Sequence, residues 1–198
     1  MITLDPKFPQ VFVNVPLKFE PGQQKDVFGK KNNKTLGSTI EHKRYSKFSE
    51  KVVKDYNNHL SQPLGKFLLS LKHCGDQFYD EFLNEYGNLE YTRFYIKDEQ
   101  FFNLKGVYAI MVANKLVYVG RCLDSFQKRF NQGYGKINPK NCYIDGQSTN
   151  CRINAKITQS KSDVELWIHQ MNDDDLIKEL ETQLIDSLSP PWNIKSPK

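Results

Sequence analysis

The stretch GVYAIMVANKLVYVG, residues 106–120, determines more of the fold than any other part of the chain. Residues 106–112 and 116–119 are rich in strand-forming residues, and residues 113–115 between them are a connection of hairpin size. The stretch therefore predicts a β-hairpin. We expect Tyr108 and Tyr118 to lie roughly opposite each other across its strands, where two aromatic rings commonly do no more than stabilise a sheet.

The residues after this hairpin predict a small α+β domain. Apolar periodicity indicates helices over 124–131, 151–159 and 173–188 and a third strand over 164–169. Residues 131–150 are rich in glycine, asparagine and proline and predict a long polar loop. We expect an α+β fold, in which a small antiparallel sheet of about three strands is flanked by helices.

The first 105 residues predict a different kind of structure. Four prolines interrupt residues 1–40, which we expect to be irregular apart from a short edge strand within PQVFVNVPLKFEP, 9–21. Helices are expected over 44–60, 63–73 and 76–86, followed by strand-forming residues at 89–96. Residues 1–105 are therefore expected to form a largely helical N-terminal extension, and residues 106–198 a separate domain.

Composition and charge exclude some classes of protein and favour others. The chain lacks the run of roughly 18 apolar residues that a membrane helix needs, and it begins without the pattern of a signal peptide. Its four cysteines are scattered, so we expect a reducing, cytoplasmic environment. Residues 25–54 and 115–161 are both rich in lysine and arginine, which indicates surfaces for a polyanion or, alternatively, solvated charged faces.

Glu181 is anomalous on physical grounds. It lies within the apolar stripe of the last predicted helix, four residues after Ile177 and four before Ile185. A carboxylate on a core-facing stripe is costly unless it is paired or binds a cation. Glu181 is therefore interpreted as a ligand for Mg²⁺ or, alternatively, as a glutamate at the edge of the stripe paired to a lysine. Residues 173–175, three aspartates in a row, are interpreted as an acidic helix cap rather than a metal cluster.

Four motifs in a fixed order resemble those of the GIY-YIG nuclease family. They are GVY at 106–108, YVG at 118–120, RCLDSFQKRF at 121–130 and ELETQLIDSLSPPWN at 179–193. The resemblance spans about 90 residues, and it implies a phosphodiester-cleaving domain with a catalytic set made of Tyr108, Tyr118, Arg129, Glu181 and Asn193.

The resemblance also implies a role for each of these residues. Tyr108 would position or deprotonate the attacking water, and Tyr118 would support the network of phosphate and water. Arg129 would grip the phosphate, Glu181 would bind Mg²⁺ or Mn²⁺, and Asn193 would hydrogen-bond the glutamate or orient a tyrosine. Some members of the family carry a histidine four residues after the arginine, where this chain has glycine, so a histidine-assisted variant is disfavoured.

The implied function is that of a metal-dependent DNA endonuclease acting on double-stranded DNA. A compact nuclease domain with accessory DNA-binding parts favours a sequence-specific type II restriction endonuclease, working as a homodimer or as a transient dimer on DNA. The alternatives are a phage or mobile-element endonuclease of loose specificity and a catalytically silent DNA-binding module. The extension of residues 1–105, with its basic stretch 25–54, is expected to serve DNA binding or dimerisation. Further DNA contacts are expected from a DNA-reading loop, 131–154, and from basic side chains inside and before it: Arg121, Lys128, Lys136, Lys140 and Arg152.

Overall fold

A computed structural model describes residues 1–194 of the chain. The chain divides into two compact units, each with its own hydrophobic core. The first unit contains residues 1–21, 92–136 and the chain from 156 onward, and the second contains residues 22–91 and 137–155. The boundary expected between residues 105 and 106 falls inside the first unit. Within residues 1–194, every helix is too short or too polar to span a membrane.

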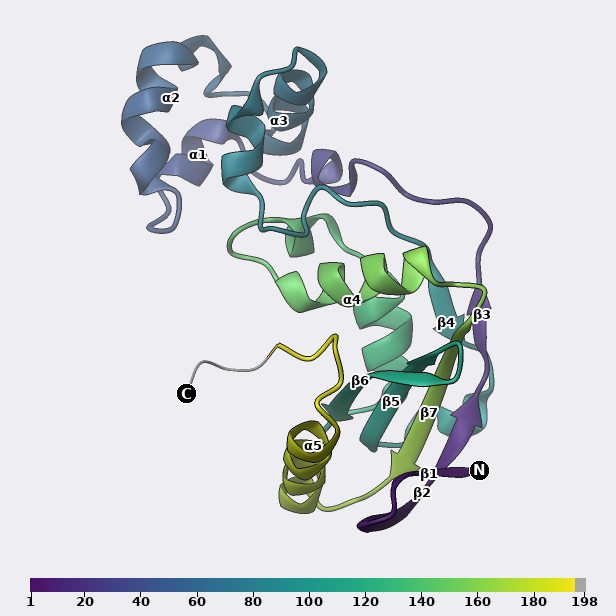
Figure 1. The fold of residues 1–198 in the computed structure, drawn as a ribbon. Coiled ribbons are helices and arrows are strands. Elements are labelled where there is room, and N and C mark those ends of the chain that lie inside the picture. The colour runs from purple at the N-terminus through teal and green to yellow at the C-terminus, as the bar shows by residue number, and fades with distance from the viewer. Residues whose placement is uncertain (195–198) are drawn as a thin grey trace. The chain divides into compact units, whose positions relative to one another are not determined.

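The first unit is built on an antiparallel sheet of five strands in the order β1-β2-β7-β5-β6 (Figure 1). The expectation of about three strands and a largely helical N-terminal extension is therefore wrong, because the first 21 residues supply strands to this unit. Two further strands pair with each other in a separate ladder, β3 with β4. The strand bounds are β1 Ile2–Asp5, β2 Phe8–Val15, β3 Leu17–Phe19, β4 Phe94–Ile96, β5 Gly106–Val112, β6 Lys115–Cys122 and β7 Val164–Gln170.

The N-terminal prolines mark the limits of strands instead of preventing them. Pro6 lies in the turn between β1 and β2, and Pro16 separates β2 from β3. Pro9 lies where the register between β1 and β2 is irregular, a position that tolerates the loss of a backbone donor. The strand expected within 9–21 thus exists, but β2 lies between β1 and β7 and is not an edge strand.

Strands β5 and β6 form the expected hairpin, with a register that differs from the expected one. Ala113 and Asn114 in the turn both have positive φ, the conformation that favours a tight hairpin connection. Tyr108 pairs with Gly120, and Tyr118 pairs with Ile110. The two tyrosines are therefore diagonal neighbours on one face of the sheet, and not direct partners across the strands.

Helix α5, Asp174–Leu188, packs on the opposite face from these tyrosines. The buried residues of this layer are Phe12, Val107, Ala109, Val119, Ile177, Leu180 and Leu184. The carboxylate of Asp173 accepts hydrogen bonds from the backbone amides of Asp175 at 2.9 Å and Leu176 at 3.0 Å. This confirms the acidic cap at the start of the helix.

A π-helix, η6, Gln127–Tyr134, packs on the tyrosine face of the sheet. It begins three residues later than the helix expected over 124–131. The backbone amide of Gly135 donates to the carbonyl of Phe130 at 2.7 Å, the five-residue spacing of this helix type. Strand β5 is covered by α5 on one side and by aromatic rings of η6 on the other. Its tyrosine, Tyr108, is therefore buried in the interior.

The second unit is a small helical body with an aromatic core. The helix expected over 63–73 is confirmed as α3, whereas the segment 44–60 forms three short helices and 76–86 contains only a 3-10 helix. The helices that lie entirely within the second unit are η1 Val27–Lys30, α1 Leu36–Ile40, η2 Ser46–Phe48, α2 Ser49–Asp55, η3 Asn57–His59, α3 Leu64–His73, η4 Gln77–Phe82 and η7 Pro139–Cys142. Two further helices are η5, Glu99–Phe101, in the first unit and α4, Ser148–Gln159, whose residues are shared between the units.

The segment 131–154 is not one loop. It contains the end of η6, all of η7 and the first half of α4. It also changes unit after Lys136. A sequence rich in glycine and asparagine here marks the caps and turns of short helices instead of one extended loop.

Candidate functional site

Three tyrosine hydroxyls meet on one face of the sheet in the first unit. The Tyr134 hydroxyl lies 2.9 Å from that of Tyr108 and 3.4 Å from that of Tyr118. The rings of Tyr108 and Tyr118 have centroids 6.1 Å apart. The two tyrosines of the hairpin are therefore joined through a third, which the sequence interpretation did not include.

Arg129 lies beside this group of hydroxyls. Its guanidinium carbon is 5.5 Å from the centroid of the Tyr134 ring. Its Nε atom is buried and has no hydrogen-bond partner within residues 1–194. A buried guanidinium donor without an acceptor is costly, and an anion entering this place would satisfy it.

The π-helix explains why Arg129 and Tyr134 act as neighbours. They are five residues apart, and the wider turn of a π-helix brings residues at this spacing close together. The family pattern directs attention to the fourth residue after the arginine, which is Gly133. Tyr134, one position later, was the signal in the sequence. Its importance can be recognised only if the segment is known to form a π-helix.

Burial keeps the Tyr108 phenol protonated. Burial raises its pKa well above the ordinary value, the phenols of Tyr134 and Tyr118 raise it further, and Arg129 opposes the rise. A phenol in this state donates a hydrogen bond but does not remove a proton near neutral pH. Of the two roles that the resemblance offers Tyr108, the geometry favours positioning over deprotonation.

Gly120 is required because Tyr108 lies directly over it. A Cβ atom at this position would come 2.5 Å from the Tyr108 hydroxyl and 2.6 Å from its Cζ atom. We expect Gly120→Ala to lower the free energy of unfolding by about 1–3 kcal/mol, because the tyrosine ring must move within a packed layer. Urea unfolding measures this effect. The control is Gly29→Ala, because the three atoms nearest to its added Cβ all belong to the Leu69 side chain, the first of them at 3.2 Å. Equal midpoints for the two variants would contradict this interpretation.

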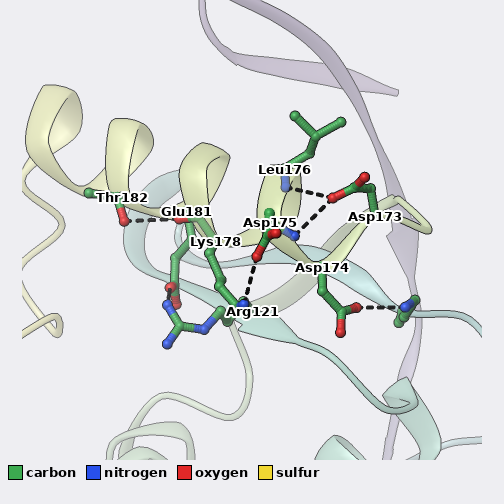
Figure 2. Close-up of polar contacts among 9 residues, drawn as sticks. Arg121, Asp173, Asp174, Asp175, Leu176, Lys178, Glu181 and Thr182 are labelled. Carbon is green, nitrogen blue, oxygen red and sulfur yellow. Dashed lines mark hydrogen bonds and ion pairs between the residues drawn. The ribbon is translucent and has the colours of Figure 1, made fainter.

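Glu181 forms an ion pair with Arg121 (Figure 2). Arg121 reaches from β6 to α5, and the glutamate side chain is 15% exposed whereas that of Arg121 is 44% exposed. The sequence predicted a partner or a bound cation for this carboxylate, and the alternative of a lysine partner is wrong. Arg121, which was also expected to contact DNA, balances the charge of this carboxylate in the structure.

Electrostatics link Glu181 to Arg129. Burial raises the pKa of the Glu181 carboxyl, and Arg121 and, more weakly, Arg129 lower it. Arg129 follows β6 on the tyrosine face, whereas Glu181 lies on α5, which covers the other face. The two side chains interact through their charges, and β6 lies at one edge of the sheet.

Asn193 binds the backbone of the edge strand. Its side-chain amide donates to the carbonyl of Val119 at 2.7 Å, and its side-chain oxygen accepts from the amide of the same residue at 2.9 Å. The backbone amide of Trp192 donates to Val117 at 2.8 Å. Asn193 therefore fixes the strand segment that carries Tyr118, and within residues 1–194 its side-chain hydrogen bonds go to Val119 and not to Glu181.

The remaining predicted DNA contacts differ in their exposure and in the unit to which they belong. Lys128 is exposed and pairs with Asp124 at 2.7 Å, and Lys136 is exposed at the end of the first unit. Lys140 is exposed on η7 of the second unit. Arg152 is only 6% exposed, so its side chain is part of the interior and is not presented to DNA.

Comparison with known proteins adds no relative. No family model, curated protein or solved structure matches this chain. Within residues 1–194 there is also no cluster of three or more His, Cys, Asp or Glu side chains arranged to hold a metal. The resemblance to GIY-YIG nucleases therefore rests on the motif residues alone.

Proposed function

We propose that the first unit is a GIY-YIG-type nuclease centre and that the protein is a metal-dependent DNA endonuclease. The observation that carries this proposal is Arg129, a half-buried guanidinium with an unsatisfied donor, beside the hydroxyls of Tyr108, Tyr118 and Tyr134. A phosphodiester brings the anionic oxygens that such a cation lacks, and planar guanidinium groups are well suited to phosphate.

Glu181 fits the donor that Mg²⁺ or Mn²⁺ would need. Mg²⁺ is usually held by one or two carboxylates, waters and substrate phosphate oxygens, so a larger cluster of acidic residues is not required. The buried carboxylate already has a cationic partner in Arg121, which indicates a place where positive charge is stabilised. Bound there, the metal would supply charge stabilisation for the leaving oxygen.

The protein side chains have separate tasks in this proposal. Arg129 binds the scissile phosphate and stabilises the charge that develops on it. Tyr108, held neutral by burial, forms a hydrogen bond with the Tyr134 hydroxyl and thereby orders the hydroxyl network in which the attacking water is positioned. Arg121, partly exposed, becomes available as a second phosphate contact when another cation takes its place at Glu181.

Among DNA endonucleases, we propose a type II restriction endonuclease. The second unit has a core of its own, which supports a dedicated role in DNA binding beside the cutting unit. One hydrolytic centre makes one nick, so a double-strand cut requires two copies, and a homodimer or a transient dimer on DNA satisfies this need.

Incubation of the purified protein with varied plasmid and phage DNA tests the proposal. We expect cleavage with Mg²⁺ or Mn²⁺ and none when EDTA is in excess. Discrete fragments with uniform ends support restriction, whereas nicked circles or a smear support an endonuclease of loose specificity. DNA binding without cleavage under every metal condition would contradict the proposal and leave a catalytically silent binding module.

A further inference from the structure

The second unit contains a group of basic side chains drawn from three separate parts of the chain. We define the basic cluster as Lys31, Lys34, Arg44 and Lys140. Burial lowers the pKa of Lys31 and Asp145 opposes this, while the charges of Lys34 and Lys140 lower it further, which places both of these ammonium groups within electrostatic reach of Lys31. Arg44 donates to the carbonyl of Ile144 at 3.3 Å, next to the acidic residue of the same surface, Asp145.

Lys31 at the centre of the basic cluster is held in place by aromatic rings. Its Nζ atom lies 4.0 Å from the centroid of Tyr143 and 6.0 Å from that of Tyr45. Both rings are fixed, because the Tyr143 hydroxyl donates to the carbonyl of Phe28 at 3.0 Å and the Tyr45 hydroxyl donates to Asp145 at 2.6 Å. A lysine fixed in this way loses little further freedom when it binds an anion.

The charge of the basic cluster is not balanced within the unit. Across residues 1–194, no member of the cluster forms an ion pair, whereas Lys25, Lys51 and Lys72 of the same unit each pair with an acidic side chain. Asp145 is the acidic group that acts on Lys31, and one of its oxygens accepts from Tyr45. Lys34 and Lys140 both repel Lys31, and a polyanion offsets this repulsion.

We propose that the basic cluster binds the phosphate backbone of double-stranded DNA, an inference that rests on the proposed nuclease function of the first unit. The exposed members come from the loop before α1, from the loop after α1 and from η7. Their origin in three segments suits a row of phosphates better than a single small anion. Their contacts would position the second unit on the duplex and add affinity without reading bases.

Fluorescence anisotropy with a labelled 30-base-pair duplex, measured without divalent metal over a range of salt, tests the inference. The variant Lys34→Gln, Arg44→Gln, Lys140→Gln is compared with a control of equal charge change, Lys25→Gln, Lys51→Gln, Lys54→Gln. We expect the cluster variant to lose about tenfold or more in affinity and about 2–3 units of salt slope, at about 0.9 per phosphate contact. The control is expected to stay near wild type. Equal losses in both variants, or none in the cluster variant, would overturn the inference.

Two further measurements keep the inference separate from the proposed function. Glu181→Gln is expected to bind the duplex as wild type does, so that binding is measured apart from cleavage. If the wild-type protein binds through the cluster but does not cut DNA with Mg²⁺ or Mn²⁺, the nuclease proposal alone is overturned. Lys31→Met, which retains the aliphatic packing on Tyr143, should also weaken binding. If the cluster variant loses affinity for polyglutamate but retains it for the duplex, the partner is an acidic protein and the inference fails.

Discussion

Replacing Glu181 by glutamine is expected to reduce Mg²⁺-dependent DNA cleavage by about 10³-fold, because the neutral amide cannot hold the divalent cation that supplies several kcal/mol of charge stabilisation. The substitution keeps the size of a side chain that is 15% exposed, so the fold should tolerate it. Initial rates of plasmid nicking over a range of Mg²⁺ concentrations measure the effect.

A matched control comes from the same helix. Glu179 is exposed, and its carboxylate accepts a hydrogen bond from Gln183 at 2.9 Å. Glu179→Gln makes the same chemical change two residues away and should cut at the wild-type rate. If both variants cut normally, Glu181 is a structural partner of Arg121 and not a metal ligand. If both lose activity, the effect belongs to the helix and not to one carboxylate.

Replacing Arg129 by alanine is expected to lower the cleavage rate by about 10²–10³-fold, the usual cost of removing one group that stabilises transition-state charge. Arg129→Lys should recover little of this loss, because a point charge cannot reproduce the planar, two-donor contact with phosphate. Single-turnover rates with excess enzyme measure the chemical step and separate it from DNA binding.

The adjacent residue provides the control for Arg129. Lys128→Ala removes one positive charge from the same turn, but that side chain is exposed and already paired with Asp124. It should change the single-turnover rate less than about threefold, since surface ion pairs contribute little. Similar losses of cleavage rate in the two variants would mean that cleavage depends on the local positive charge in general and not on the half-buried guanidinium of Arg129. Urea unfolding of Arg129→Ala shows whether any loss comes from misfolding.

The sequence predicted the hairpin and the last helix because their signals are local. Residues 106–120 carry both strands and their turn, and Asp173 caps its own helix. Burial of Glu181 followed from its place in the apolar stripe. The partner of Glu181 could not be predicted in this way, because Arg121 lies 60 residues earlier and only the packing of α5 against β6 brings the two together.

The errors have physical causes of a different kind. Pairing of β2 with β7 joins residues about 150 positions apart, such as Val13 with Ile168, and no local pattern encodes that choice. The prolines also made the region resemble irregular chain. Tyr134 was missed because the relevant spacing is set by a π-helix, which propensities do not distinguish from an α-helix.

The contacts of Asn193 with Val119 have a consequence for how copies of the protein can associate. One amide side chain presents a donor and an acceptor where a neighbouring strand would present its backbone, and Trp192 adds a second link. These backbone groups of β6 are therefore unavailable to a strand from another molecule. Pairing of exposed edge strands is the usual route to edge-to-edge aggregation, and it is blocked along this stretch. Two copies of the protein that associate would therefore have to join through another surface.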